Sequence, residues 1–68
     1  MNFIVITSDN KKCILKFCEK NLTNDWILKH EKTGRKFMFS PSINRLMEIL
    51  PYRKFKLIDK GTKMVKVD

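Results

Sequence analysis

The sequence lacks several residue types on which common functional sites depend. Its 68 residues include two glycines, two cysteines and one histidine, and no alanine or glutamine. Two isolated glycines, Gly34 and Gly61, cannot form a glycine-rich phosphate-binding loop. Cys13 and Cys18 are five positions apart, which is not the spacing of a redox or zinc pair, and only His30 could join them. We therefore expect no metal site, no cofactor and two buried, reduced cysteines.

A catalytic constellation is missing as well. No serine or cysteine forms a recognisable pattern with His30, and the acidic side chains lie beside cations, as charge partners do. His30 is expected to be a packed or half-exposed strand residue. A chain of this length buries only about 60% of the surface that its unfolded form exposes, which leaves little room for a deep pocket. The sequence therefore predicts a protein that is not an enzyme.

Long apolar runs are missing too. The first one, within NFIVIT at residues 2–7, is too short for a membrane span and lacks the basic flank of a secretory leader. We expect a cytoplasmic protein with no membrane contact, folded as one small basic domain over residues 1–68. Frequent Lys, Asn and Ile suggest an AT-rich genome, and with it a phage or mobile-element accessory protein.

Positive charge is abundant and unevenly placed. Fifteen lysines and arginines stand against seven acids, which gives a formal net charge of +8. Through Asp25 four lysines face three acids, whereas from Trp26 onward eleven cations face four acids. Such a basic region is typical of proteins that bind polyanions. The simpler interpretation is that the lysines only keep a small protein in solution.

Alternating and β-branched segments predict that most of the chain forms strands. Residues 2–7 are typical of an inner strand covered on both faces, and SDNK at 8–11 is typical of a turn. Residues 12–20 fit either a strand or a helix. We favour the strand because it would follow a tight turn and form a hairpin with the first.

A second hairpin is predicted over residues 26–40, around Gly34. Its register stays open. A two-residue loop would place Leu28 opposite Phe39, and a three-residue loop would place Ile27 opposite Phe39. A last hairpin is expected around Lys60-Gly61.

Residues 41–50 carry the signals of a helix. Ser40 can cap it, Pro41 suits its first position, and Pro51 prevents its continuation. Ile43, Leu46, Met47 and Leu50 recur at helical spacing. The expected fold class is therefore α+β: a small, mostly antiparallel sheet of about six short strands, in the order β-β-β-β-α-β-β, with one short helix at 41–50.

The basic positions indicate a non-enzymatic nucleic-acid-binding module that recognises the phosphate backbone or shape through a basic face in residues 26–68. Lysine acts as a point charge toward phosphate, and only three arginines are present for base readout, so weak sequence preference is expected. Tyr52 is the candidate for stacking on a base. Phe55 is instead expected to point into the core. The predicted DNA- or RNA-binding residues are Lys32, Arg35, Lys36, Arg45, Tyr52, Arg53, Lys54 and Lys56.

A different interpretation is a small effector or inhibitor that docks on an acidic surface of a host protein. It predicts an exposed apolar centre, with Trp26, Met38 and Tyr52 as candidates, ringed by charge. It also predicts an exposed sheet edge open to strand addition or to pairing into a homodimer.

Overall fold

The computed structural model describes residues 1–67, which form one antiparallel sheet of seven strands. Across the sheet the order is β6-β5-β4-β3-β2-β1-β7, so β1 to β6 form a meander and β7 returns to pair with β1. A three-residue 3₁₀ turn, η1 (Pro51–Arg53), joins β5 to β6. The strands are β1 (Asn2–Ile6), β2 (Lys12–Lys20), β3 (Trp26–Lys29), β4 (Lys36–Ser40), β5 (Arg45–Leu50), β6 (Lys54–Lys60) and β7 (Lys63–Lys66).

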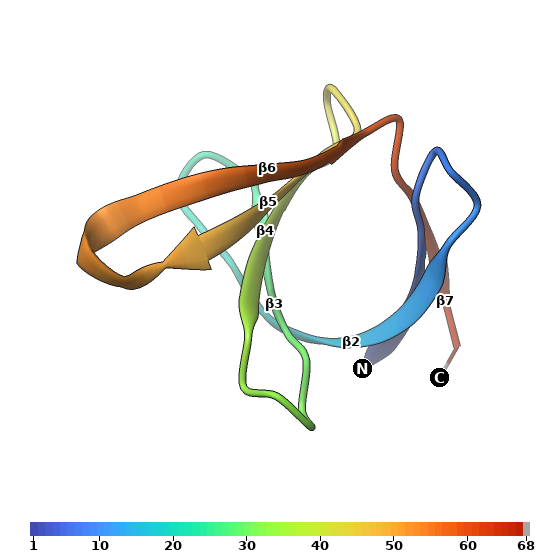
Figure 1. The fold of residues 1–68 in the computed structure, drawn as a ribbon, viewed down its shortest axis with the longest axis horizontal. Helices are drawn as coiled ribbons and strands as arrows, with labels where there is room; N and C mark the ends of the chain where they lie inside the picture. Colours follow the sequence, from blue (N-terminus) through green and yellow to red (C-terminus); the bar gives the residue numbers. More distant parts are fainter. Residues whose placement is uncertain (68) are drawn as a thin grey trace.

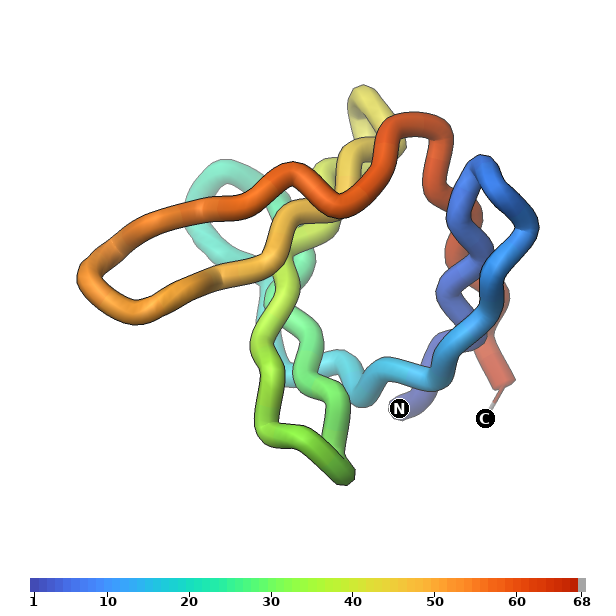
Figure 2. Tube along the Cα trace, viewed as in Figure 1, coloured from blue at the N-terminus to red at the C-terminus, as the bar shows by residue number. Residues whose placement is uncertain are grey.

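The sheet curls so strongly that its two outermost strands are continuous in the chain. β6 and β7 lie at opposite ends of the strand order, yet only Gly61 and Thr62 separate them. Figures 1 and 2 show the chain turning around a central space, with the β5–β6 hairpin projecting as an arm. Irregular pairing between β2 and β3 and between β5 and β6 contributes, because bulges bend and twist strands. The sheet therefore covers its own core.

The core lies on the concave face of this curled sheet. Leu15 and Leu28 are fully buried, and each such side chain contributes about 1.5–3 kcal/mol through burial. Trp26 is half-buried and packs against two core rings, at 5.1 Å from Phe3 and 5.5 Å from Phe39 between centroids. The buried hydrophobic residues are Phe3, Val5, Leu15, Leu28, Phe37, Phe39 and Leu46.

The helix expected at 41–50 is not formed, so the α+β class is wrong and the chain is nearly all β. Residues 41–44 form a turn in which Asn44 has a φ of 52°, and β5 follows. The spacing that suggested one apolar helix face also suits a strand with apolar side chains on both faces. Leu46 is buried in the core, whereas Met47 lies on the convex face and is half-buried. Pairing with β4 and β6 satisfies the backbone on both sides.

The last two strands exist but do not form the expected hairpin. β6 pairs with β5, and β7 pairs with β1. Gly61 has a φ of 82°, and both Gly61 and Thr62 donate backbone hydrogen bonds to the carbonyl oxygen of Asn44, at 2.9 Å each. The glycine therefore bends one long strand rather than closing a pair.

The β3–β4 hairpin forms, but in neither register considered from the sequence. Leu28 lies opposite Phe37 and Trp26 opposite Phe39. His30 closes a longer loop: its N–H donates to the carbonyl oxygen of Arg35 at 2.8 Å. The loop is longer than a tight two- or three-residue turn, and this shifts every pair.

The beginning of the chain agrees better with expectation. Residues 12–20 are a strand, and a turn precedes them. β1 pairs on both sides, although side chains on its convex face, such as Ile4, are only partly covered. Cys13 and Cys18 are free, as expected, but exposed rather than buried. Within residues 1–67 no helix is long and apolar enough to cross a membrane.

Candidate nucleic-acid interface

Three lysines lie side by side on the convex face of the sheet. Lys16 on β2 pairs with Lys29 on β3, and Lys29 pairs with Lys36 on β4. All three are exposed, because their neighbours in each strand point to the core. Adjacent strands are about 4.8 Å apart, so the three side chains originate in a line across the strands. We call Lys16, Lys29 and Lys36 the lysine row.

The lysine row has no acidic partner within the described residues. The ion pairs found between residues 1 and 67 are Lys11–Asp9 and Arg35–Glu48, and neither involves the row. Two exposed carboxylates, on Glu19 and Glu31, border it without forming an ion pair there. Like charges directly opposite each other across strands are destabilising. The row is thus a cluster of positive charge that forms no ion pair within the described residues.

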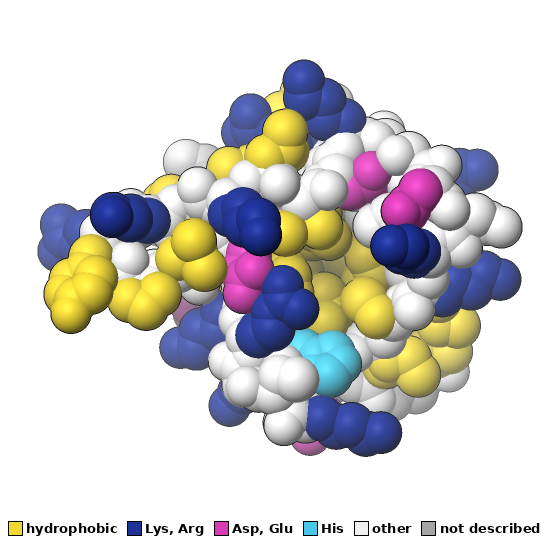
Figure 3. Space-filling view, in the orientation of Figure 1, with side chains coloured by type: hydrophobic (Ala, Val, Ile, Leu, Met, Phe, Trp, Pro, Cys, Tyr) yellow, Lys and Arg dark blue, Asp and Glu magenta, His cyan; other side chains and the backbone are white. Residues whose placement is uncertain are grey.

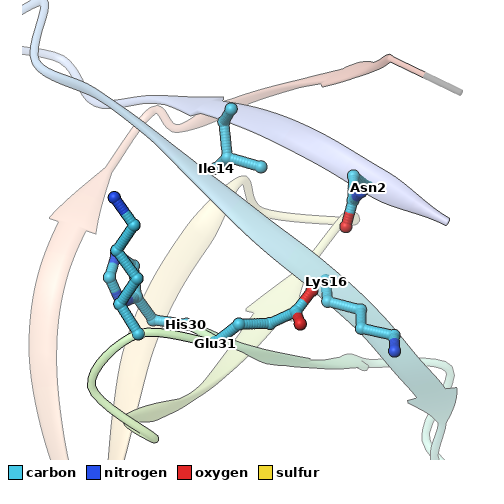
Figure 4. A pocket seen from close by; sticks show the side chains of 6 residues that line it. Asn2, Ile14, Lys16, His30 and Glu31 are labelled. Carbon is cyan, nitrogen blue, oxygen red and sulfur yellow. The ribbon is translucent and has the colours of Figure 1, made fainter.

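A shallow pocket of about 300 Å³ lies at one end of the row. Figure 4 shows Ile14 and Lys16 on β2 at one side of it, and His30 and Glu31 on the β3–β4 loop at the other. The His30 ring is held locally, with its Nδ1 3.0 Å from Oγ1 of Thr33. Charges of both signs line this pocket. It continues the charged surface of the row and shows no catalytic arrangement.

Apolar side chains continue the same convex face beyond the row. Lys36 pairs with Ile49 on β5, and Ile49 pairs with Phe55 on β6. The line of side chains that begins with the lysine row therefore ends at an aromatic ring. The ring of Phe55 is 50% exposed. Figure 3 shows hydrophobic and basic side chains together on the projecting arm. We call the apolar part of the convex face the apolar band; it comprises Ile27, Met38, Met47, Ile49, Phe55 and Leu57.

The arm ends in two residues with an unfavourable backbone. Tyr52 and Arg53 have φ values of 63° and 59°, in the left-handed region. At the other left-handed positions of residues 1–67 the chain has Asn or Gly, which tolerate this conformation. A bulky side chain there costs about 1–2 kcal/mol, and such strain often marks functional positions. Tyr52 is also 92% exposed, so burial does not explain it.

Carboxylates on the concave side have specific partners instead. Glu48 is 8% exposed and accepts two hydrogen bonds from Arg35, at 2.8 Å from Nε and 2.7 Å from Nη2. These bonds hold the pKa of the Glu48 carboxyl below its ordinary value, against the effect of burial, and Lys56 adds a smaller contribution. The Arg35 guanidinium also lies 5.1 Å from the ring centroid of Phe37.

Asp59 joins the two ends of the curled sheet. It accepts hydrogen bonds from the backbone N–H of Ser8 at 3.0 Å and from the Ser8 hydroxyl at 2.5 Å. The Thr62 hydroxyl donates a third, at 2.7 Å. These side-chain bonds lower the pKa of the Asp59 carboxyl. The β1–β2 turn is thus attached to the bend between β6 and β7.

The structure does not gather the predicted site residues into one patch. Arg35 is held by Glu48, and Lys56 lies opposite Glu48 on β6. Arg45 is half-buried, and its Nε is buried without a hydrogen-bond partner among the described residues. Arg35 and Lys56 are nevertheless exposed, as are Lys32 on the β3–β4 loop, Lys36 in the lysine row, and Tyr52, Arg53 and Lys54 on the arm. Their role in binding stays a prediction.

Sequence reasoning missed Lys16, Lys29 and Phe55. The two lysines join Lys36 only through the true register, which the sequence left open. Phe55 was expected in the core, but it lies on the convex face of the arm, where nothing within residues 1–67 covers it fully. The predicted alternation of side chains along this strand is correct, but Phe55 lies on the convex face instead of the core face.

No protein-family model, curated protein or solved structure matches the chain. No group of three or more His, Cys, Asp or Glu side chains in residues 1–67 could hold a metal ion. The function must therefore be inferred from the surface of this chain itself.

Proposed function

We propose that the protein is a nucleic-acid-binding module that holds a single strand along the convex face of its sheet. The observation that carries this proposal is the lysine row, three exposed lysines in direct cross-strand register with no acidic partner within residues 1–67. Like charges in direct cross-strand register destabilise the free protein. A chain of phosphates lying across the strands would neutralise the row.

Aromatic side chains support a single strand over a duplex. Phe55 lies at the end of the line that begins with the lysine row, and Tyr52 is at the tip of the arm. Bases of a single strand can stack on exposed rings, whereas the bases of a duplex are already stacked on each other. Lysine neutralises phosphate as a point charge, so recognition would follow the backbone with little sequence preference.

The remaining parts of the proposal follow from this use. A protein that binds nucleic acid in this way needs no catalytic groups, and we propose that it is not an enzyme. We place it in the cytoplasm, and the two free thiols support a reducing compartment. A phage or mobile-element accessory role is compatible with its size and charge.

The test is fluorescence anisotropy with a labelled ten-nucleotide single strand and the corresponding duplex, across a range of salt. We expect the single strand to bind more tightly. Replacing Lys29 and Lys36 by Gln should weaken its binding at least tenfold. The matched control replaces Lys12 and Lys63, two exposed strand lysines that flank Ile6 on the other side of the molecule. Equal losses in the two double variants would show that only net charge matters and would overturn the proposal.

A further inference from the structure

The free edge of β6 is a second candidate binding surface. Residues 54–57 pair with β5 on one side only, because β6 is an outermost strand. On the other side no backbone hydrogen bond joins them to another segment of residues 1–67. This stretch belongs to the arm that projects from the curled body (Figure 1). A free edge of this kind is a template for an added strand.

The side chains of this edge alternate between charge and apolar surface. Lys54 and Lys56 lie on the concave side of the arm, opposite Leu50 and Glu48. Phe55 and Leu57 lie on the convex side and are 50% and 46% exposed. An added strand would place its own side chains next to these two rows in alternation.

A second copy of the chain fits this edge poorly. An antiparallel pair of β6 strands that keeps Phe55 and Leu57 on one face must bring Lys54 or Lys56 opposite another lysine. Like charges in that position destabilise the pair, and edge lysines are a common protection against self-pairing. The same lysines would attract a strand that carries carboxylates at those positions.

We propose that β6 accepts, by strand addition, a segment of another protein in which acidic and apolar side chains alternate. Its acidic residues would lie opposite Lys54 and Lys56, and its apolar residues would extend the apolar band at Phe55 and Leu57. The main-chain groups of alternate residues in 54–57 would supply the hydrogen bonds. This surface shares Phe55 with the path proposed for the single strand but excludes the lysine row, so the inference does not depend on nucleic-acid binding.

The test uses a blocked seven-residue peptide that alternates glutamate and valine. A second peptide of the same composition has its glutamates grouped at one end. Binding is followed by calorimetry, and amide hydrogen exchange locates the contact. We expect the alternating peptide to bind at least tenfold more tightly than the grouped one and to slow exchange within residues 54–57. Equal binding of the two peptides, or binding without protection of these amides, would overturn the proposal.

Reversing the charge of the β6 edge gives a stricter test. The variant Lys54→Glu with Lys56→Gln should lose affinity for the acidic peptide about tenfold and gain affinity for a peptide that alternates lysine and valine. Lys12→Glu with Lys63→Gln makes the same change in net charge elsewhere and should alter either affinity less than threefold. A similar loss in this control would show that the edge is not the site. Replacing Lys29 and Lys36 by Gln should leave the affinity for the alternating acidic peptide within threefold, and this keeps the two proposals separate.

Discussion

On the concave side of the sheet, carboxylates have specific partners. Glu48 accepts two hydrogen bonds from Arg35, and Asp59 accepts three from Ser8 and Thr62. On the convex side and the arm, Lys16, Lys29 and Lys36 face each other without an acid, and Phe55 and Tyr52 lie exposed. The two carboxylates on the concave side thus have partners, whereas the lysine row has no ion pair within residues 1–67.

The partnered carboxylates stabilise the fold, whereas the lysine row and the exposed rings of the arm do not. A 68-residue domain has little stability to spare. Mutual repulsion along the lysine row and left-handed backbone at Tyr52 and Arg53 both reduce that stability. Under the proposed function, a bound chain of phosphates would relieve the repulsion along the lysine row. Substitutions can test this difference, because the two regions should respond in opposite ways.

The largest effect is expected in the core. Leu28→Ala removes a fully buried side chain and should lower the free energy of unfolding by about 2–5 kcal/mol. The matched change Leu57→Ala, on the arm, should lower it by less than about 1 kcal/mol because that side chain is 46% exposed. Urea unfolding followed by the fluorescence of Trp26 measures both. Equal losses would mean that the arm belongs to the core.

The next effect concerns the buried carboxylate. Glu48→Gln removes a charge-assisted pair and leaves Arg35 without its acid, so the unfolding free energy should fall by about 1–3 kcal/mol. Glu31→Gln, at an exposed position without an ion pair in residues 1–67, should change it by less than about 0.5 kcal/mol. Thermal unfolding of the two variants at pH 7 makes the comparison. A similar result for both would contradict the distinction between the faces.

The same carboxylates predict the response to acid. The pKa values of Glu48 and Asp59 are lowered in the folded protein. Their stabilisation is therefore complete above the ordinary carboxyl range and is lost as the pH falls through the folded-state values. Melting temperatures from pH 7 to pH 2 should fall across the acid range, and less steeply in Glu48→Gln. Equal slopes would exclude Glu48 as a contributor.

At the tip of the arm, one substitution should raise the stability of the protein and weaken its binding of the single strand. Tyr52→Asn places a residue that tolerates the left-handed backbone at φ 63° and should raise the unfolding free energy by up to about 1 kcal/mol. The same change removes a stacking ring, so binding of the single strand should weaken by about 1–3 kcal/mol. Unfolding and anisotropy on one preparation measure both quantities. Weaker binding together with lower stability would indicate only damage to the fold.

The sequence predicted the strands well and their partners poorly. Residues 2–6, 12–20 and 54–60 alternate or are β-branched, and these local patterns survive in the structure. The segment at 41–50 carries helix signals in Ser40, Pro41 and its apolar spacing, but Leu46 and Met47 also fit the two opposite faces of a strand. Pairing with β4 and β6 decided between them, and no local signal reports that pairing.

The candidate site was less predictable for the same reason. Lys36 and Tyr52 could be singled out from composition and position, but the lysine row exists only through the register of β2, β3 and β4. A shift by one residue would move its lysines to the opposite face. The length of the loop from His30 to Arg35 sets the pairing of Lys29 with Lys36, and the sequence alone allowed shorter turns; the pairing of Lys16 with Lys29 depends on the β2–β3 connection.

The most direct measurement replaces Lys29 and Lys36 by Gln and records both stability and the salt dependence of single-strand binding. Relief of like-charge repulsion should raise the unfolding free energy by about 0.2–1 kcal/mol. Loss of two phosphate contacts should reduce the slope of log K against log salt by about 1.4. A more stable protein with weaker, less salt-dependent binding is the predicted result. An unchanged slope, or a loss of stability, would contradict the claim that the lysine row is a binding surface.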